Sequence, residues 1–129
     1  MSTVAFVPRT FAFDFDGVIG EYHGFQGEDN LGIPNPEVVS AMRILKQKGN
    51  RIILFSTHSA LLLRDYCATH EIPFDYINEN PEKFGANKGK PVATVYIDDR
   101  AYCYRGQSAD TLVEDLEQFQ PHWKRSELH

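Results

Sequence analysis

Residues 11–18 of the chain read FAFDFDGV, an apolar run that ends in two carboxylates separated by one residue. The alternation of phenylalanine with alanine, and the aromatic enrichment, favour a β-strand over a helix. Asp14 and Asp16 then lie at the carboxyl end of the strand, where Gly17 lets the chain turn sharply. Ligands of open α/β sheets bind at this edge. Because neighbouring acids repel each other unless a cation or a shared proton relieves them, the run predicts a site.

The composition is that of a single folded domain covering residues 1–129, since 42% of the residues are hydrophobic and 24% are charged. The net charge of −5 argues against nucleic acid as a partner. Cys67 and Cys103 lack CxxC spacing and neighbouring His or Cys, which argues against zinc and leaves a single disulfide open. A secretory signal and an apolar run of about 18–20 residues are both missing. We therefore expect a cytoplasmic protein that does not bind membranes.

Beyond the first strand, strand-like and helix-like segments alternate. Three further strand-like runs are present: Arg51–Ser56, Phe74–Ile77 and Thr94–Ile97. Three helix-like segments are present: from Asn35 to Gly49, from Ser59 to about Thr69, and from Ser108 to about Gln120, with Asn35 and Ser108 as predicted N-caps. Strands joined by helical crossovers predict an α/β, Rossmann-like three-layer sandwich with a central, mainly parallel sheet and helices on both faces.

Two longer polar segments connect these elements. The first, residues 17–33, is punctuated by glycines and predicts a hairpin-like flap or a mobile loop. Its ring-bearing side chains can contact substrate or another subunit: Tyr22, His23 and Phe25. The second covers residues 78–91, and neither segment is long enough to fold alone. The end of the chain, residues 124–129, is expected to be frayed and exposed.

Polar side chains follow three of the predicted strands. They are Asp14 and Asp16 after the first strand, Ser56 after the second, and Asp98 and Asp99 after the fourth, with Lys90 just before the fourth. The carboxyl ends of parallel strands meet at one edge of a sheet, so these side chains are expected to converge. Converging aspartates suit a hard, oxygen-preferring cation, and Mg²⁺ is the usual one beside phosphate.

Each of these residues also has a purely structural explanation. The first two acids can form an Asx turn that closes a strand, and Ser56 can cap the following helix. The Asp98–Asp99 pair can interact with Arg100, and Lys88 can take the place of Lys90. Only the ordered set of residues, in the correct strand contexts, favours a site over these explanations.

The order of the motifs resembles the haloacid dehalogenase (HAD) superfamily of phosphatases. The motifs are DFDGV at residues 14–18, a strand ending in Ser56, Lys90 in KGKP, and VYIDD at residues 95–99. The resemblance covers roughly positions 11 to 101. It implies a HAD-like hydrolase without a cap domain, because both connecting segments are short. Asp16 favours phosphate chemistry, since the dehalogenase branch lacks the second aspartate of this motif.

The resemblance implies a Mg²⁺-dependent phosphomonoester hydrolase with four catalytic residues. Asp14 would be the nucleophile that forms an aspartyl-phosphate intermediate. Asp16 would protonate the leaving oxygen and then activate water. Ser56 would hydrogen-bond a phosphoryl oxygen, and Lys90 would pair with both Asp14 and the phosphate.

The resemblance also implies a metal centre and an open substrate site. Mg²⁺ would be held by the Asp14 and Asp98 carboxylates and the Asp16 backbone carbonyl, while Asp99 would either contribute a further ligand or orient Lys90. Candidate substrate contacts are Gly17, Thr57, His58 and Asn80, although Asn80, like Asn78, is also a typical turn residue. His58 stands where close relatives often have arginine, which leaves the contact with the leaving group open.

An open site suits a phosphorylated small metabolite, saccharide or macromolecule, or a site that a neighbouring subunit closes. Two other functions stay open from the sequence. One is a catalytically silent HAD-like module used for binding or scaffolding. The other is a phosphotransferase acting on a sugar or nucleotide acceptor, which normally needs a lid to exclude water.

Overall fold

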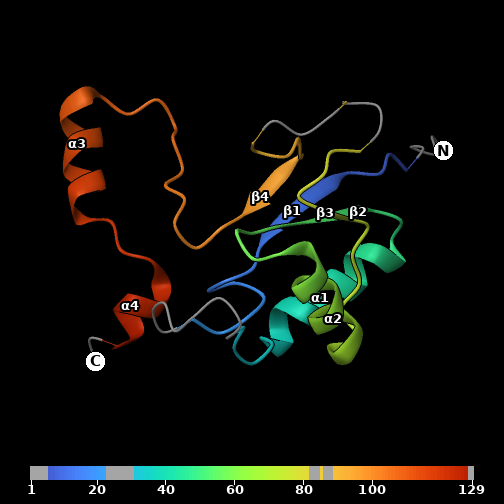
Figure 1. Cartoon of the computed structure of the whole chain (residues 1–129). Coiled ribbons are helices and arrows are strands. Elements are labelled where there is room, and N and C mark those ends of the chain that lie inside the picture. Colours follow the sequence, from blue (N-terminus) through green and yellow to red (C-terminus); the bar gives the residue numbers. More distant parts are fainter. Residues whose placement is uncertain (1–5, 23–30, 82–84, 86–88, 128–129) are drawn as a thin grey trace.

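A computed structural model describes residues 6–22, 31–81, 85 and 89–127 of the chain. Four parallel strands form one sheet in the order β3-β2-β1-β4 (Figure 1). The strands are β1 (Thr10–Asp14), β2 (Arg51–Phe55), β3 (Tyr76–Ile77) and β4 (Val95–Ile97). The predicted α/β, Rossmann-like class with a parallel central sheet is confirmed.

The strand register brings the predicted polar residues to one edge of the sheet. Phe13 of β1 lies opposite Leu54 of β2 on one side and Ile97 of β4 on the other. The residues that follow these positions, including Asp14 and Asp98, therefore leave the sheet at the same edge.

The helices begin where their capping residues predict. They are α1 (Pro36–Gln47), α2 (Ala60–His70), α3 (Ala109–Gln118) and α4 (His122–Glu127). Asn35 caps α1 with a side-chain oxygen that accepts hydrogen bonds from the backbone N–H groups of Glu37 and Val38. Ser59 and Ser108 cap α2 and α3 in the same way. The predicted N-caps Asn35 and Ser108 are confirmed, Ser59 is a cap that the sequence did not predict, and α4 is a helix that the sequence did not predict.

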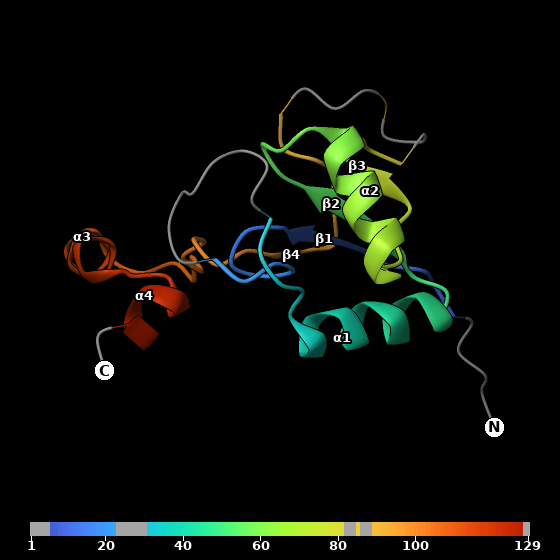
Figure 2. The same ribbon diagram turned by 60° about the horizontal axis from the view of Figure 1, so that its bottom comes forward.

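Both α1 and α2 cover the same face of the sheet (Figure 2). Met42 of α1 and Leu63 of α2 are fully buried in one cluster with Phe13 of β1. Successive right-handed crossovers in one direction place consecutive helices on one face, which explains this arrangement. Cys67 of α2 lies in the same core, and it and Cys103 are both free thiols.

The opposite face of the sheet is covered by the β3–β4 connection rather than by a helix, as far as the described residues extend. Tyr96 of β4 lies on this face, and its hydroxyl donates to the Pro91 carbonyl over 2.6 Å. The expected helices on both faces are thus replaced on one face by an irregular segment. Residues 78–91 are rich in asparagine, glycine and proline, a composition that disfavours a helix.

The amphipathic helix expected after Ser108 forms, but its apolar side chains do not join the core. Val113 is 54% exposed and Leu116 is 51% exposed, and α3 contains no buried residue. Figures 1 and 2 both show α3 standing apart from the sheet.

The end of the chain is more ordered than expected. Residues 122–127 form α4, and Trp123 within it is only 8% exposed. The expectation of a frayed end from Lys124 is therefore wrong as far as Glu127, because these residues continue the helix that the buried indole anchors. Lys124 is exposed, as expected, and residues 128–129 lie outside the described residues.

The base of the flap is a hairpin, as predicted. Gly20 forms an antiparallel bridge with Pro34, and the Glu21 N–H donates to the Ile33 carbonyl over 2.9 Å. His23 and Phe25 lie outside the described residues, whereas Tyr22 lies edge-on against the Trp123 ring, 4.9 Å between centroids. No helix in the described part of the chain has both the length and the apolar character needed to cross a membrane.

Candidate functional site

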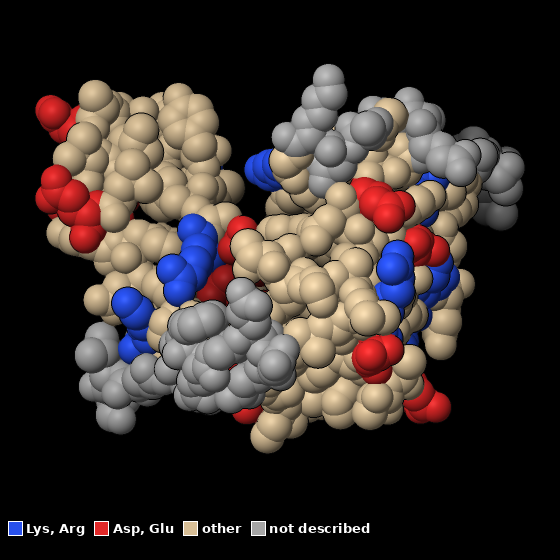
Figure 3. All heavy atoms as spheres, in the orientation of Figure 1, with Lys and Arg blue, Asp and Glu red and all other residues tan. Residues whose placement is uncertain are grey.

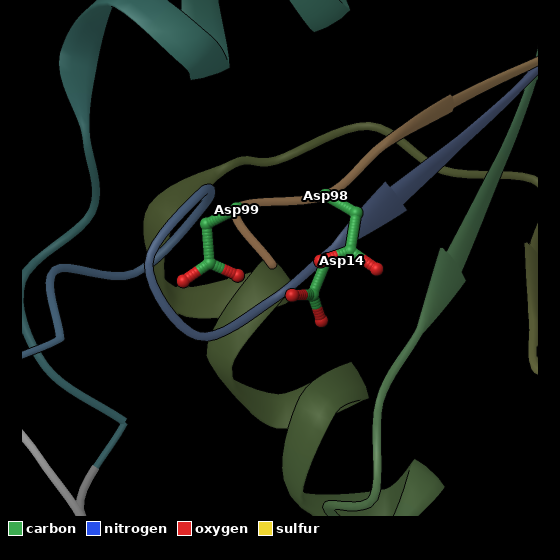
Figure 4. Close-up of side chains that lie close together, drawn as sticks. All are labelled: Asp14, Asp98 and Asp99. Atoms are coloured by element: carbon green, nitrogen blue, oxygen red, sulfur yellow. The ribbon is translucent and has the colours of Figure 1, made fainter. Parts of the chain in front are cut away.

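Three carboxylates meet at the edge of the sheet where β1 and β4 end. Asp14 closes β1, and Asp98 and Asp99 follow β4 (Figure 4). One oxygen from each of the three lies within 4.8 Å of the others. The structure therefore brings together acids that are more than eighty positions apart in the sequence, as the parallel topology predicts.

The Asp14 carboxyl is strongly affected by this environment. Burial raises its pKa, the adjacent Asp99 carboxyl and the negative charge of Asp98 raise it further, and the total brings the pKa to about 8. The Phe15 N–H, which donates to Asp14 Oδ1 over 2.8 Å, acts in the opposite direction but is outweighed. With a pKa of about 8, Asp14 is largely protonated at neutral pH when no cation is bound.

The Asp99 carboxylate has one oxygen that a cation could bind. Its Oδ2 accepts a hydrogen bond from Trp123 Nε1 over 2.8 Å. Its Oδ1 is buried and has no hydrogen-bond partner among the described residues. A buried polar atom without a partner is costly, and a metal ion is one way to satisfy it. All three acids offer hard oxygen ligands, so the group fits Mg²⁺ by its chemistry.

Gly17 lies behind this acidic group. A side-chain carbon at this position would be 2.4 Å from Asp99 Oδ2, and the backbone φ of +83° is one that glycine tolerates best. The Gly17 carbonyl accepts a hydrogen bond from His122 Nε2 over 2.7 Å. Gly17 was predicted to contact substrate. It is instead buried, and its lack of a side chain lets the Asp99 carboxylate lie close to its backbone.

Asp16 faces a different neighbour. Its two carboxylate oxygens lie 2.9 and 3.1 Å from His58 Nε2, so that the ring N–H donates to the carboxylate. The His58 side chain is only 7% exposed and packs edge-on against the Phe15 ring. The Asp16 carboxylate stays outside the group of three acids, but its side chain is 32% exposed toward solvent. Its position is suited to proton transfer with a bound molecule.

These groups share one cleft of about 680 Å³. Its lining includes residues expected from the sequence: Asp14, Asp16, Ser56, Thr57, Lys90, Asp98 and Asp99. Tyr22 and Arg100 also line it, although the sequence analysis assigned neither a catalytic role. Figure 3 shows a hollow beside the part of the molecule that carries α3, where acidic and basic side chains lie next to each other.

Lys90 lines the cleft without contacting the acids. Its Nζ lies 4.0 Å from the centroid of the Tyr96 ring, and it forms no ion pair with any described carboxylate. The expected pairing with Asp14 is therefore not present in this conformation. Lys88, the alternative to Lys90, lies outside the described residues.

The sequence left two roles open for Ser56: capping of the following helix, or a hydrogen bond to a phosphoryl oxygen. The hydrogen bonds around Ser56 exclude the capping role. Ser59 rather than Ser56 caps α2, while Ser56 Oγ accepts from the His58 N–H over 3.1 Å. The Asn78 side chain holds both backbone groups of Ser56: its Oδ1 accepts from the N–H over 3.0 Å and its Nδ2 donates to the carbonyl over 2.9 Å. Asn78 has a φ of 54°, so it also forms a turn.

The structure also decides whether Arg100 pairs with the two acids and whether Asn80 lines the cleft. Arg100 donates its backbone N–H to Asp98 Oδ1 over 2.8 Å, but its guanidinium lies over the Trp123 and Tyr22 rings rather than on either acid. Asn80 lies away from the cleft lining, and its Oδ1 accepts from the Val92 N–H over 2.8 Å. In this structure Asn80 stabilises the β3–β4 connection.

The C-terminal segment contributes two contacts to the site that the sequence did not predict. Trp123 and His122 reach Asp99 and Gly17 from positions 24 and 105 residues away. A lone tryptophan near the end of a chain has no local pattern that links it to an acid. The one available indication was its apolar bulk, which is rarely left fully exposed.

Comparisons with known proteins support the fold. No protein-family model matches the chain, and no curated protein matches its sequence. The chain is similar to the solved structure of a conserved protein coded by a locus of Bacteroides thetaiotaomicron. The two are 27% identical, with a TM-score of 0.60, and the match covers 87% of this chain and 91% of that chain. The likeness supports the α/β, Rossmann-like architecture, so the function must be argued from the site.

Proposed function

We propose that this protein is a Mg²⁺-dependent phosphomonoester hydrolase of the HAD type, acting through Asp14. The observation that carries the proposal is the acidic group at the sheet edge, with the buried, unpartnered oxygen of Asp99. A second carboxylate, Asp16, faces the same cleft and is held by His58. This combination supplies a candidate nucleophile, an acid–base group and a cation site within one cleft.

In the first step, an Asp14 oxygen attacks the phosphorus atom as the bond to the leaving oxygen breaks. Asp16 donates its proton to that leaving oxygen, which departs as an alcohol. Asp14 is then joined to the phosphoryl group through a new phosphorus–oxygen bond. The separation of the two acids by one residue allows one to attack while the other reaches the leaving group.

In the second step, Asp16 takes a proton from a water molecule that attacks the phosphorus atom. The bond to Asp14 breaks, which releases inorganic phosphate and restores both carboxyl groups to their starting states. Ser56 lines the cleft and would donate its hydroxyl to a phosphoryl oxygen. Lys90 reaches the same cleft and would contact the phosphate by leaving the Tyr96 ring.

Asp14, Asp98 and Asp99 would hold the cation, which when bound offsets the negative charge of the phosphate and of the nucleophile. This role agrees with the raised pKa of Asp14, about 8, because an ionised nucleophile needs a positive partner. In the absence of such a partner, much of Asp14 would be protonated at neutral pH and unable to attack.

The proposal is tested by phosphate release from an aryl phosphate such as p-nitrophenyl phosphate. We expect release that requires Mg²⁺ and stops on addition of EDTA. Asp14→Asn removes the nucleophilic oxygen with almost no change of shape, and we expect a loss of about 10³-fold or more. Asp110→Asn is the matched control, because Asp110 is an exposed aspartate on α3, outside the cleft lining.

Three results would contradict the proposal in different ways. Release that is unaffected by Asp14→Asn would exclude Asp14 as the nucleophile. Mg²⁺ binding without release of phosphate from any of a panel of sugar, nucleotide, lipid and protein phosphates would indicate a silent binding module. Transfer of the phosphoryl group to an added sugar or nucleotide, in place of free phosphate, would indicate a phosphotransferase.

A further inference from the structure

Asp99 is held by a residue from the far end of the chain. The Trp123 Nε1–H donates to Asp99 Oδ2 over 2.8 Å, and the indole is only 8% exposed. Since Oδ2 is occupied by this hydrogen bond, Oδ1 is the oxygen that remains available to a cation. That oxygen is buried and has no partner among the described residues.

Two chain segments, the loop after β1 and the loop after β4, hold α4 and its indole in place. Tyr22, at the base of the flap, packs edge-on against it, with 4.9 Å between ring centroids. The guanidinium carbon of Arg100, directly after the two acids, lies 5.6 Å from the centroid of the indole ring. The neighbouring His122 donates from Nε2 to the Gly17 carbonyl over 2.7 Å. The C-terminal segment thus contacts both the loop after β1 and the loop after β4.

The absence of a side chain at Gly17 leaves room for the Asp99 carboxylate and the Trp123 indole to meet. A side-chain carbon there would lie 2.4 Å from Asp99 Oδ2 and 3.2 Å from Trp123 Cδ1. The carboxylate is therefore confined between the Gly17 backbone and the indole. A carboxylate held on one oxygen has lost most of its freedom to rotate, so the other oxygen keeps a fixed direction.

We propose that Trp123 is a positioning residue for the cation site: its indole N–H fixes Asp99 so that Oδ1 faces Asp14 and Asp98. Figure 4 shows Asp99 with one oxygen on the side of Asp14. The inference rests on the Mg²⁺ site of the proposed function, but it adds a role for the C-terminal segment. Partners of this kind, which orient a metal ligand without touching the metal, typically contribute 10–100-fold to metal affinity.

The chain contains one tryptophan, so its fluorescence reports on this contact directly. We expect Mg²⁺ to produce a saturable change in tryptophan emission that EDTA reverses. In Trp123→Phe the ring can still pack against Tyr22, but the N–H donor is lost. We expect this variant to bind Mg²⁺ about 10–100-fold more weakly in isothermal titration calorimetry.

A matched control removes a comparable contact elsewhere. The Tyr102 hydroxyl donates to Asp115 on α3, which is another aromatic donor to an aspartate. Tyr102→Phe should leave Mg²⁺ affinity unchanged. If Trp123→Phe fails to fold, replacement of tryptophan by 3-benzothienylalanine keeps the bicyclic shape, lacks the N–H, and alters no other position in this chain.

A double-mutant cycle tests whether Trp123 acts through Asp99. We expect Asp99→Asn to weaken Mg²⁺ binding, and the double variant with Trp123→Phe to bind no more weakly than Asp99→Asn alone. Losses that multiply in the double variant would show that Trp123 acts by another route and would overturn the inference.

The remaining outcomes distinguish this inference from the proposed function. Wild-type affinity in both N–H-deficient proteins would overturn the role of Trp123 and leave the phosphatase proposal intact. Mg²⁺ binding that depends on Trp123, without phosphate release, would support this inference and contradict the enzyme. A wild-type protein that shows no response to Mg²⁺ in fluorescence or calorimetry would overturn both.

Discussion

Asp16 lines the cleft, whereas His58, predicted as a substrate contact, lies outside the cleft lining and holds the Asp16 carboxylate. His58 Nε2 lies within 3.1 Å of both Asp16 oxygens, and the imidazole is almost fully buried. In the proposed mechanism Asp16 is the general acid, which must be aimed at the leaving group, and the hydrogen bond from His58 limits the rotation of the Asp16 carboxylate. The position that the HAD resemblance associates with an arginine is therefore used here to hold another side chain.

Removal of the His58 side chain should impair catalysis through its effect on Asp16. We expect His58→Ala to lower kcat by about 10²-fold with a small effect on KM, because the reacting group loses its orientation while the phosphate contacts remain. His58→Gln keeps an N–H donor and should recover part of the loss. Steady-state kinetics with p-nitrophenyl phosphate in Mg²⁺ measures both effects.

His70→Ala is the control for a general effect of removing a histidine. His70 ends α2, packs against the Tyr66 ring, and lies outside the cleft lining. Thermal unfolding of each variant separates loss of catalysis from loss of folded protein. A His58→Ala variant that raises KM with kcat unchanged would instead indicate that His58 contacts the substrate.

The elements of this fold differ in how firmly they are attached to the core. The helix α1 buries Val39 and Met42 against the sheet, and Asn35 caps its first turn. The helix α3 is capped by Ser108 but buries no residue. Helices in proteins depend mainly on tertiary packing, so the two caps should have unequal effects on global stability.

We expect Asn35→Ala to lower the free energy of unfolding by about 1 kcal/mol, as is typical for loss of an N-cap side chain. Ser108→Ala should change it by much less, because α3 can unfold without opening the core. Urea denaturation followed by circular dichroism measures both. Equal losses in the two variants would show that α3 unfolds together with the sheet, through contacts outside the described residues.

Across the whole molecule, the acidic edge of the sheet should make stability depend on pH and on divalent cations. The Asp14 pKa is about 8 in the folded chain and near 3.8 when unfolded. At a pH between about 4 and 8, unfolding therefore releases the proton that Asp14 holds in the folded chain. The stabilising effect of the bound proton is complete below about pH 4, declines as the pH rises, and is gone above about pH 8.

Mg²⁺ should reverse this trend because it binds the ionised carboxylates. We expect the Mg²⁺-induced rise in Tm to be larger at about pH 8 than at about pH 5, and to reach several degrees at saturating Mg²⁺. Thermal unfolding in EDTA and in Mg²⁺ over this range measures it. In Asp14→Asn the pH dependence assigned to Asp14 should disappear; an unchanged profile would assign it to other groups.

The residue sequence alone determined the four strands, the starts of α1, α2 and α3, and the edge where the acids gather. These features follow from local patterns: short apolar runs of strand length, capping residues such as Asn35 and Ser108, and acids directly after the strands. Once the strands are parallel, residues that follow them must share an edge, so Asp14 and Asp98 could be placed together without coordinates.

Only the tertiary structure decided which acids face one another and what holds them. Asp16 turns to His58, 42 residues away, while Asp99 joins Asp14 and Asp98 and is held by Trp123. It also decided that Lys90 lies over Tyr96 and that α3 stays away from the core. Such contacts depend on packing between distant segments, and no periodicity or neighbouring residue in the sequence reports them.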